Sequence, residues 1–167
     1  MCETDTEASG GAMHSSFFAS CPKGFERLLA DELRGLGIPK PRPLRGQVAF
    51  SGTLEDAYRV CLWSRLASRV VLVLGRVDAP DSDSLYEGVS SIAWEEHIPC
   101  ASSIAIDAHG ANAQLKDTRF TALRTKDAIV DRLMSMRGTR PLISVADPDL
   151  RIVARISGKR ATLGIDR

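Results

Sequence analysis

The stretch LRIVARISGKRATLGI, residues 150–165, decides how the C-terminal half of this chain folds. Apolar residues alternate with other residues on both sides of Gly158, which is the period-two pattern of a strand with one buried face. Gly158 and Lys159 supply a two-residue turn between the two strands. The stretch therefore predicts a β-hairpin whose first strand turns Arg151 and Arg155 away from the core.

Upstream of this hairpin, strand patterns and helix patterns alternate along the chain. The predicted strands are Phe17–Cys21, Gln47–Phe50, Arg69–Val77 and Ser103–Ala108, and the predicted helices are Lys23–Leu36, Thr53–Ala67, Ser84–Trp94 and Thr118–Arg137. Residues 40–45 are rich in proline and predict a loop. This order predicts an α+β chain made of two small layered units.

The boundary between the two units is expected in residues 78–83, which are polar and interrupted by a proline. Residues 17–78 would then form the first unit and residues 79–167 the second. Residues 1–16 are small and polar, and we interpret them as a disordered tail.

The helix predicted at 118–137 has an irregular apolar face. On a helical wheel the apolar arc is centred on Arg119 and includes Leu123, with Lys126 inside it. A lysine at such a position needs a partner or a polar gap. Lys126 is therefore either in a buried ion pair, for example with Asp107, or placed to bind a phosphate.

The composition excludes several classes of protein. The chain has 167 residues, of which 44% are hydrophobic and 26% charged, as in ordinary globular domains. No apolar run is long enough to cross a membrane and the N-terminus lacks the pattern of a secretory signal, so the expected location is the cytoplasm, with no membrane partner. The four cysteines are widely and irregularly spaced, without a CxxC motif, so no metal site is expected.

No motif in the sequence indicates catalysis. There is no glycine-rich loop between a strand and a helix, and the three histidines are isolated from any nucleophile or metal-ligating cluster. We therefore expect no catalytic residue and no cofactor-binding residue in this chain.

Charge is unevenly distributed along the sequence. Residues 61–115 contain three bases and seven acids, whereas residues 116–167 contain twelve bases and six acids, within a net charge of +1. Such an asymmetry indicates an acidic partner, usually nucleic acid. The other interpretation is that two faces of one domain differ in sign.

Basic side chains of the last third supply a candidate phosphate-binding surface. Arg151 and Arg155 are four residues apart on one strand face, and Lys116 and Arg119 begin a helix, where free N–H groups favour an anion. Alternatively, Arg151 and Arg155 pair with acids such as Asp149 and only keep the sheet soluble. The predicted RNA-binding residues are Lys116, Arg119, Arg124, Lys126, Arg151, Arg155, Lys159 and Arg160.

Four motifs, in this order, resemble one family. They are FFASCPKGFE at 17–26 with LADEL at 29–33, LEDAYRVCLWSRLASR at 54–69, ALRTKDAIVD at 122–131 and PDLRI at 148–152. The chain is similar along residues 17–167 to the bacterial large-subunit rRNA guanine-N2 methyltransferases, which are often labelled N6-adenine-specific DNA methylases.

This resemblance implies a fold and a function. It implies a ferredoxin-like N-terminal unit followed by a THUMP domain, which is an RNA-binding module. The chain would position 23S rRNA for its own C-terminal methyltransferase domain, which is absent from this sequence. The fragment itself would then be no enzyme, whereas the full-length protein would be an S-adenosylmethionine-dependent rRNA methyltransferase whose cofactor is bound in the missing domain. Two alternatives remain open: a protein-interaction or dimerisation module, and part of a DNA adenine-N6 methylase.

Overall fold

A computed structural model describes residues 14–166 of the chain. The described residues form two compact units. The N-terminal unit comprises residues 14–73 together with Asp166, and the C-terminal unit comprises residues 74–165. Each unit is considered below by itself.

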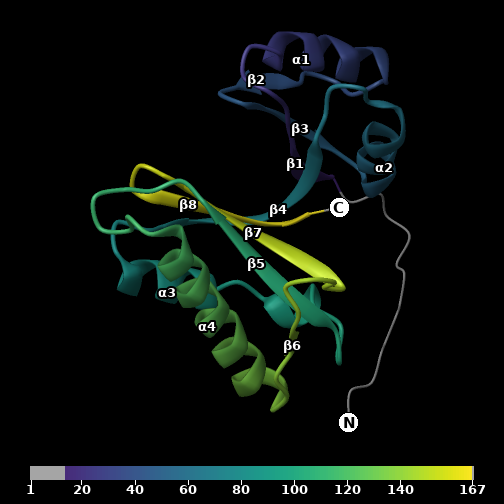
Figure 1. Ribbon diagram of the computed structural model, residues 1–167. Helices are drawn as coiled ribbons and strands as arrows, with labels where there is room; N and C mark the ends of the chain where they lie inside the picture. Colours follow the sequence, from purple (N-terminus) through teal and green to yellow (C-terminus); the bar gives the residue numbers. More distant parts are fainter. Residues whose placement is uncertain (1–13, 167) are drawn as a thin grey trace. The chain divides into compact units, whose positions relative to one another are not determined.

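The N-terminal unit is a small antiparallel sheet with two helices (Figure 1). Its strands are ordered β2-β3-β1-β4 across the sheet. The elements are β1 (Ser15–Ser20), α1 (Glu26–Gly35), β2 (Arg42–Leu44), β3 (Gln47–Gly52), α2 (Leu54–Trp63) and the first part of β4 (Arg69–Asp78). Leu29 and Leu33 of α1 are fully buried against the sheet, together with Val48 of β3.

The start of α2 agrees with its sequence. Thr53 accepts a hydrogen bond from the Asp56 backbone N–H at 3.2 Å, and the Asp56 carboxylate accepts one from the Thr53 N–H at 2.9 Å. This reciprocal arrangement is a capping box, and it satisfies N–H groups that the helix itself cannot pair.

Two predictions for this unit need correction. Ser15 and Ser16 belong to β1 rather than to a disordered tail, and the rest of the predicted tail, residues 1–13, lies outside the described residues. The proline-rich segment contains the short strand β2, in which Arg42 is opposite Ala49 and Leu44 is opposite Gln47. Proline is tolerated there because β2 is at the edge of the sheet.

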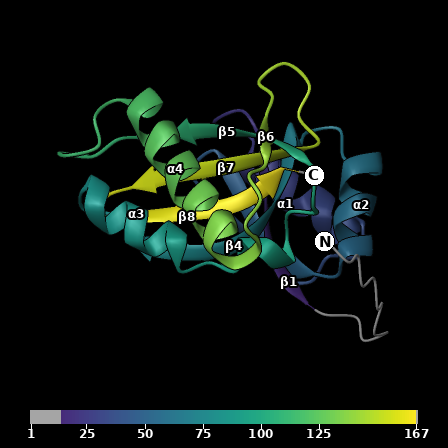
Figure 2. The same ribbon diagram turned by 90° about the horizontal axis from the view of Figure 1, so that it is seen from below.

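The C-terminal unit has α3 and α4 on one face of its sheet (Figures 1 and 2). The strand order is β4-β8-β7-β5-β6, and β5 runs parallel to both β6 and β7. The elements after β4 are α3 (Ser82–Ser90), the single 3-10 turn η1 (Trp94–Glu96), β5 (Ser103–His109), α4 (Thr118–Arg137), β6 (Leu142–Ile143), β7 (Leu150–Ser157) and β8 (Arg160–Asp166). Within the described part of the chain, no helix is long and apolar enough to cross a membrane.

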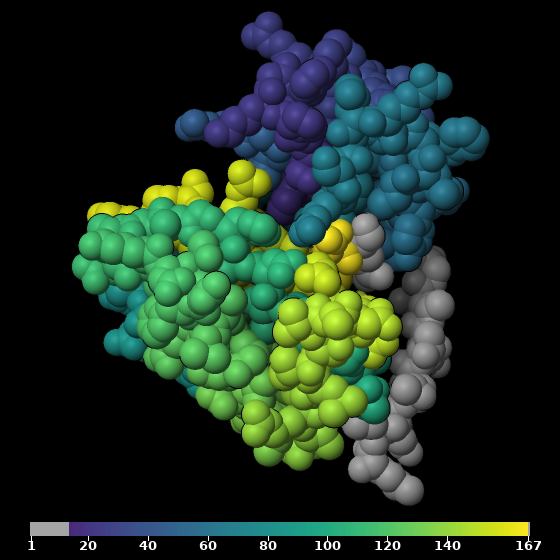
Figure 3. Space-filling view, viewed as in Figure 1, coloured from purple at the N-terminus to yellow at the C-terminus, as the bar shows by residue number. Residues whose placement is uncertain are grey.

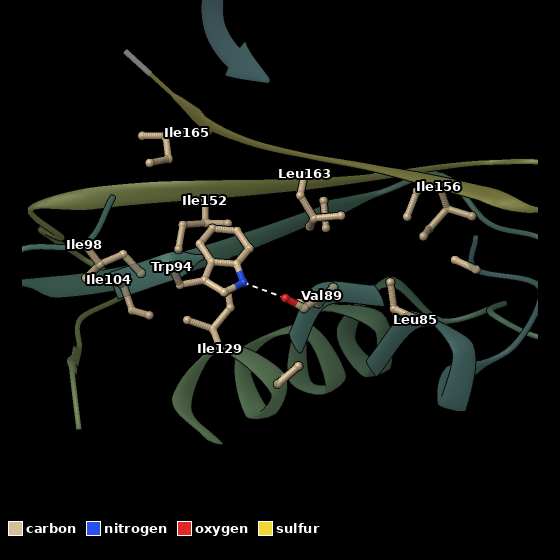
Figure 4. Close-up of a cluster of buried hydrophobic side chains, with 14 of the residues drawn as sticks. Leu85, Val89, Trp94, Ile98, Ile104, Ile129, Ile152, Ile156, Leu163 and Ile165 are labelled. Atoms are coloured by element: carbon tan, nitrogen blue, oxygen red, sulfur yellow. Dashed lines mark hydrogen bonds between the residues drawn. The ribbon is translucent and has the colours of Figure 1, made fainter. Parts of the chain in front are cut away.

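The predicted hairpin is confirmed as β7 and β8. Gly158 takes the positive φ of +58° that the turn requires. Ile152, Ile156 and Leu163 face the core, where the Trp94 indole donates a hydrogen bond to the Val89 carbonyl at 2.7 Å (Figure 4). The buried tryptophan therefore has its one polar atom satisfied.

Helix α4 has the predicted bounds and ends at Gly138 in the left-handed conformation. Its predicted buried face is wrong in part, because Ile129, Val130 and Leu133 are buried as predicted but other residues of that face are not. Leu123 and Phe120 are about half exposed, whereas Thr121 and Thr125 are completely buried. Each threonine hydroxyl donates to the carbonyl four residues earlier, at 3.1 Å and 2.8 Å, so burial leaves neither hydroxyl unpaired.

The observed orientation of α4 also corrects the interpretation of Lys126. Its ammonium group is 3.5 Å from the carboxylate of its neighbour Asp127, and 29% of its side chain is exposed. Asp107, the partner suggested by the sequence, instead pairs with Arg151. Lys126 therefore does not form the suggested ion pair with Asp107.

Candidate nucleic-acid interface

A short loop, residues 110–117, connects the end of β5 to the start of α4. The Asn112 side-chain amide donates to the carbonyls of Ala79 and Gly158, at 2.8 Å and 2.9 Å. Its oxygen accepts the backbone N–H groups of Leu115 and Gln114. All four bonding positions of this amide are used, so the loop is fixed to the β7–β8 turn and to the residue after β4.

Gly110 brings the backbone of this loop against β7. Its φ is +81°, and a Cβ atom at this position would be 2.1 Å from the Ile156 carbonyl oxygen. No other residue fits this close approach without a shift of the backbone. The β7–β8 turn is held on its other side by a 2.7 Å hydrogen bond from the Ala79 N–H to the Lys159 carbonyl.

Four of the predicted RNA-binding residues are at this end of the unit. They are Lys116, Arg119, Lys159 and Arg160. All four are exposed, and none forms an ion pair with another described residue. Lys116 is in the loop and Arg119 in the first turn of α4 after it, whereas Lys159 is in the β7–β8 turn and Arg160 begins β8. Because Asn112 joins the loop to this turn, the four cations share one end of the C-terminal unit.

The start of α4 is not an open anion site. The Asp117 carboxylate accepts a hydrogen bond from the Arg119 backbone N–H at 2.8 Å, and so it caps the helix. This corrects the expectation of a free N–H group at Arg119, and the negative charge of Asp117 disfavours a second anion beside it. Any phosphate at this end would be bound by side chains.

The other predicted residues, Arg124, Lys126, Arg151 and Arg155, have partners within the protein. Arg124 is 3.2 Å from the Asp83 carboxylate and stacks over the Tyr86 ring, 4.5 Å from its centre. The Tyr86 hydroxyl donates to Asp131, and this hydrogen bond raises the pKa of the tyrosine. These contacts tie α3 to α4 and leave Arg124 only partly available.

Arg151 and Arg155 are on the sheet face opposite α3 and α4. In the parallel register Arg151 is beside Ala105 and Arg155 is beside His109, whereas the neighbouring Ile152 faces the helices. The shared face is therefore confirmed.

The acid that pairs with Arg151 is Asp107, at 2.9 Å, and not Asp149. Asp149 accepts the N–H and the hydroxyl of Ser103, and these hydrogen bonds lower its pKa. The alternative interpretation is thus correct in that Arg151 pairs with an acid, but the acid is Asp107 rather than Asp149.

Folding also redistributes the charge seen in the sequence. Residues 74–165 contain twelve bases and twelve acids, whereas residues 14–73 contain nine bases and five acids. The basic last third is therefore part of a neutral unit, and the positive excess lies in the N-terminal unit. Sequence reasoning missed the cations of residues 39–47, although KPRPLRG at 40–46 was a visible signal.

Comparison with known domain families divides the chain in two. Residues 16–71 match the RlmL ferredoxin-like domain, and residues 79–166 match the THUMP domain. The predicted α+β fold, with a ferredoxin-like unit before a THUMP domain, is therefore confirmed.

Longer proteins contain a region similar to this chain. A Syntrophotalea carbinolica protein named ribosomal RNA large subunit methyltransferase K/L is 47% identical over 150 residues, which are 90% of this chain and 21% of that protein. The chain thus spans about one fifth of the length of such relatives.

Two solved structures share the fold over 92% of this chain at 27% sequence identity. One is a Listeria monocytogenes protein named as a predicted N6-adenine-specific DNA methylase, with a TM-score of 0.82 and 40% of that protein covered. The other is SMU.472, solved in complex with SAH, with a TM-score of 0.81 and 41% covered. Each has the fold of both units.

Proposed function

The chain belongs to the THUMP domain family, and from that premise we propose that it is an RNA-binding module that positions large-subunit rRNA for methylation. The methyl transfer itself would belong to the remainder of a longer protein, because the chain matches only about a fifth of the rRNA methyltransferases it resembles. These relatives, 41–47% identical and named for ribosomal RNA, favour RNA over DNA as the substrate.

One observation carries this proposal: four exposed cations, which form no ion pair within residues 14–166, lie at the end of the unit where Asn112 joins the loop to the β7–β8 turn. Lys116, Arg119, Lys159 and Arg160 would contact phosphates there. Phosphate contacts position RNA without reading its sequence. We assign weaker contacts to Arg124, Lys126 and Arg151, because each also holds an acid of the protein, and to Arg155, which also has a partner within the protein.

S-adenosylmethionine does not fit the described residues. The turns that enter α3 and α4 contain no glycine-rich loop, and each is capped by a carboxylate, Asp81 or Asp117. The cofactor of the proposed methylation would therefore be bound outside this chain. We propose the cytoplasm, where ribosomes are assembled, as its location.

The test is binding of this chain to a structured 23S rRNA fragment and to duplex DNA at two salt concentrations. We expect tighter binding to the RNA. Lys116→Gln, Lys159→Gln and Arg160→Gln together should lower the log–log salt slope by about 2, since each phosphate contact contributes roughly 0.7 to 0.9.

Arg140→Gln is the matched control for each single variant. Arg140 is exposed and lies beyond the C-terminal end of α4, about 30 Å along the helix from Lys116. Equal weakening by Arg140→Gln and Lys159→Gln would contradict the proposed surface. Equal affinity for RNA and DNA would favour the DNA methylase alternative.

A second candidate function, a protein-contact module, rests on β6. This edge strand and its continuation expose Leu142, Ile143 and Val145, which are 64%, 47% and 79% exposed. They lie in the segment that follows α4, green to yellow in Figure 3. If this edge joins two copies, sedimentation at high protein concentration should show a dimer that Ile143→Lys dissociates. A monomer at all concentrations would exclude self-association.

A further inference from the structure

The N-terminal unit contains the positive excess of this protein, and its cations fall into two classes. Arg34, Arg59 and Arg69 are held by Asp31, Asp56 and Asp166. The exposed cations without an ion pair among the described residues are Lys23, Arg27, Lys40, Arg42, Arg45 and Arg65. Five of these six lie in two segments, residues 21–27 and residues 39–47.

Hydrogen bonds hold these two segments side by side. The Cys21 N–H donates to the Gly46 carbonyl at 3.1 Å. The Glu26 carboxylate accepts the Gly46 N–H with one oxygen and the Gly24 N–H with the other, both at 2.9 Å. Cations far apart in the sequence are thereby gathered around one turn.

Glu26 is the one acidic residue in the two segments. Hydrogen bonds to its carboxylate, first from its own backbone N–H and then from Gly46, lower the pKa of Glu26. The carboxylate therefore stays charged while it fastens the turn, and the two segments contain five cations and this single anion. The loop end of the C-terminal unit, by contrast, has Asp117 beside Lys116 and Arg119.

The cations and prolines of the β2 edge indicate which kind of partner this surface binds. Arg42 is in the edge strand β2, Lys40 precedes this strand and Arg45 follows it in the turn to β3, so a polyanion beside β2 would meet cations at both ends of the strand and within it. The prolines at 39, 41 and 43 lack N–H donors. An edge without these donors is poorly suited to pairing with a peptide strand. The edge therefore favours a phosphate backbone over an added protein strand.

We propose that residues 21–27 and 39–47, the β2 surface, form a second RNA-contact surface. Lys23, Arg27, Lys40, Arg42 and Arg45 bind its phosphates. The ring of Phe25, 43% exposed within the same surface, offers a face on which a base stacks. This inference rests on the proposed function in that the chain binds RNA, but it places contacts in the other unit.

The experiment compares two double variants of the full chain that remove the same charge from the same unit. Arg42→Gln with Arg45→Gln alters the β2 surface, whereas Arg34→Gln with Arg65→Gln alters exposed arginines outside it. Binding to the 23S rRNA fragment is measured over a range of salt concentrations. The first pair should lower the salt slope by about 1.5 and weaken binding at least about fivefold, whereas the control pair should change affinity by less than about twofold.

The outcomes separate this inference from the proposed function. RNA binding that Arg42→Gln with Arg45→Gln weakens no more than the control overturns the β2 surface and leaves the proposed function standing. A wild-type chain that binds no RNA overturns both. Poly-L-glutamate binding that the β2 pair abolishes, with RNA binding kept, assigns the surface to an acidic protein and also overturns the inference. Circular dichroism and unchanged melting temperatures confirm that both variants are folded.

Discussion

The two units differ in how they use charge. In the C-terminal unit, ion pairs bring acids from the middle of the sequence onto bases from its end: Asp83 with Arg124, Glu95 with Arg132 and Asp107 with Arg151. In the N-terminal unit the pairs Asp31–Arg34 and Asp56–Arg59 are three residues apart within one helix. The C-terminal unit is neutral because its bases and acids are equal in number, whereas an excess of bases leaves the N-terminal unit positive, although Arg69 there also has a long-range partner in Asp166. A run of charge in a sequence is therefore no guide to charge on a surface until its partners are known.

The comparison can be sharpened with a pair of glycines, one in each unit. Gly110 and Gly46 both have a positive φ, +81° and +74°. A Cβ at Gly110 meets the Ile156 carbonyl oxygen, whereas a Cβ at Gly46 meets nothing within 4 Å. Gly110→Ala should therefore lower the free energy of unfolding by roughly 3 kcal/mol or more, and Gly46→Ala by about 1 to 2 kcal/mol.

Urea unfolding followed by circular dichroism measures both glycine variants. Equal losses of stability would show that the close approach at Gly110 relaxes without cost. In that case the loop end would be less rigid than its Asn112 hydrogen bonds indicate.

The two faces of α4 give the next largest effect. Leu133 is 2% exposed, and Leu123 on the same helix is 51% exposed. Leu133→Ala should cost about 2 to 5 kcal/mol of unfolding free energy through the cavity it leaves. Leu123→Ala should cost less than about 1 kcal/mol. Similar costs would favour the face that the helical wheel predicts and would contradict the structure.

The sequence predicts the elements and their buried faces well where each element has a single apolar face. The β7–β8 hairpin and the bounds of α4 follow directly from alternation, Gly158 and Gly138. The orientation of α4 does not, because apolar residues lie on two of its faces and two threonines satisfy their own hydroxyls inside the core. A helical wheel counts Thr125 as polar. Its hydroxyl is hydrogen-bonded within the helix, however, so burying it costs little free energy.

The candidate interface is predictable only in part. The exposed cations beside the β7–β8 turn could be found from their sequence alone. The amide of Asn112 could not, because its partners are 33 and 46 residues away. The same holds for the acids that pair with Arg124 and Arg151, and for the hydrogen bonds that set residues 21–27 beside residues 39–47. Such contacts depend on tertiary structure rather than on local pattern.

The smallest expected effect concerns pH and tests whether long-range pairs matter more than local ones. The Arg132 guanidinium donates two hydrogen bonds to Glu95, at 2.7 Å and 3.0 Å, and this lowers the pKa of that carboxyl below its ordinary value of about 4.5. A depressed folded-state pKa stabilises the protein above the unfolded pKa, and the gain is lost as the pH falls through the folded value. Glu95→Gln should therefore lower the melting temperature at pH 7 by a few degrees, and the difference from wild type should shrink below about pH 4.

Asp31→Asn is the control, because the Asp31–Arg34 pair is exposed and such pairs contribute little. If Asp31→Asn lowers the melting temperature as much as Glu95→Gln at pH 7, the long-range pair has no special weight and the contrast between the units fails.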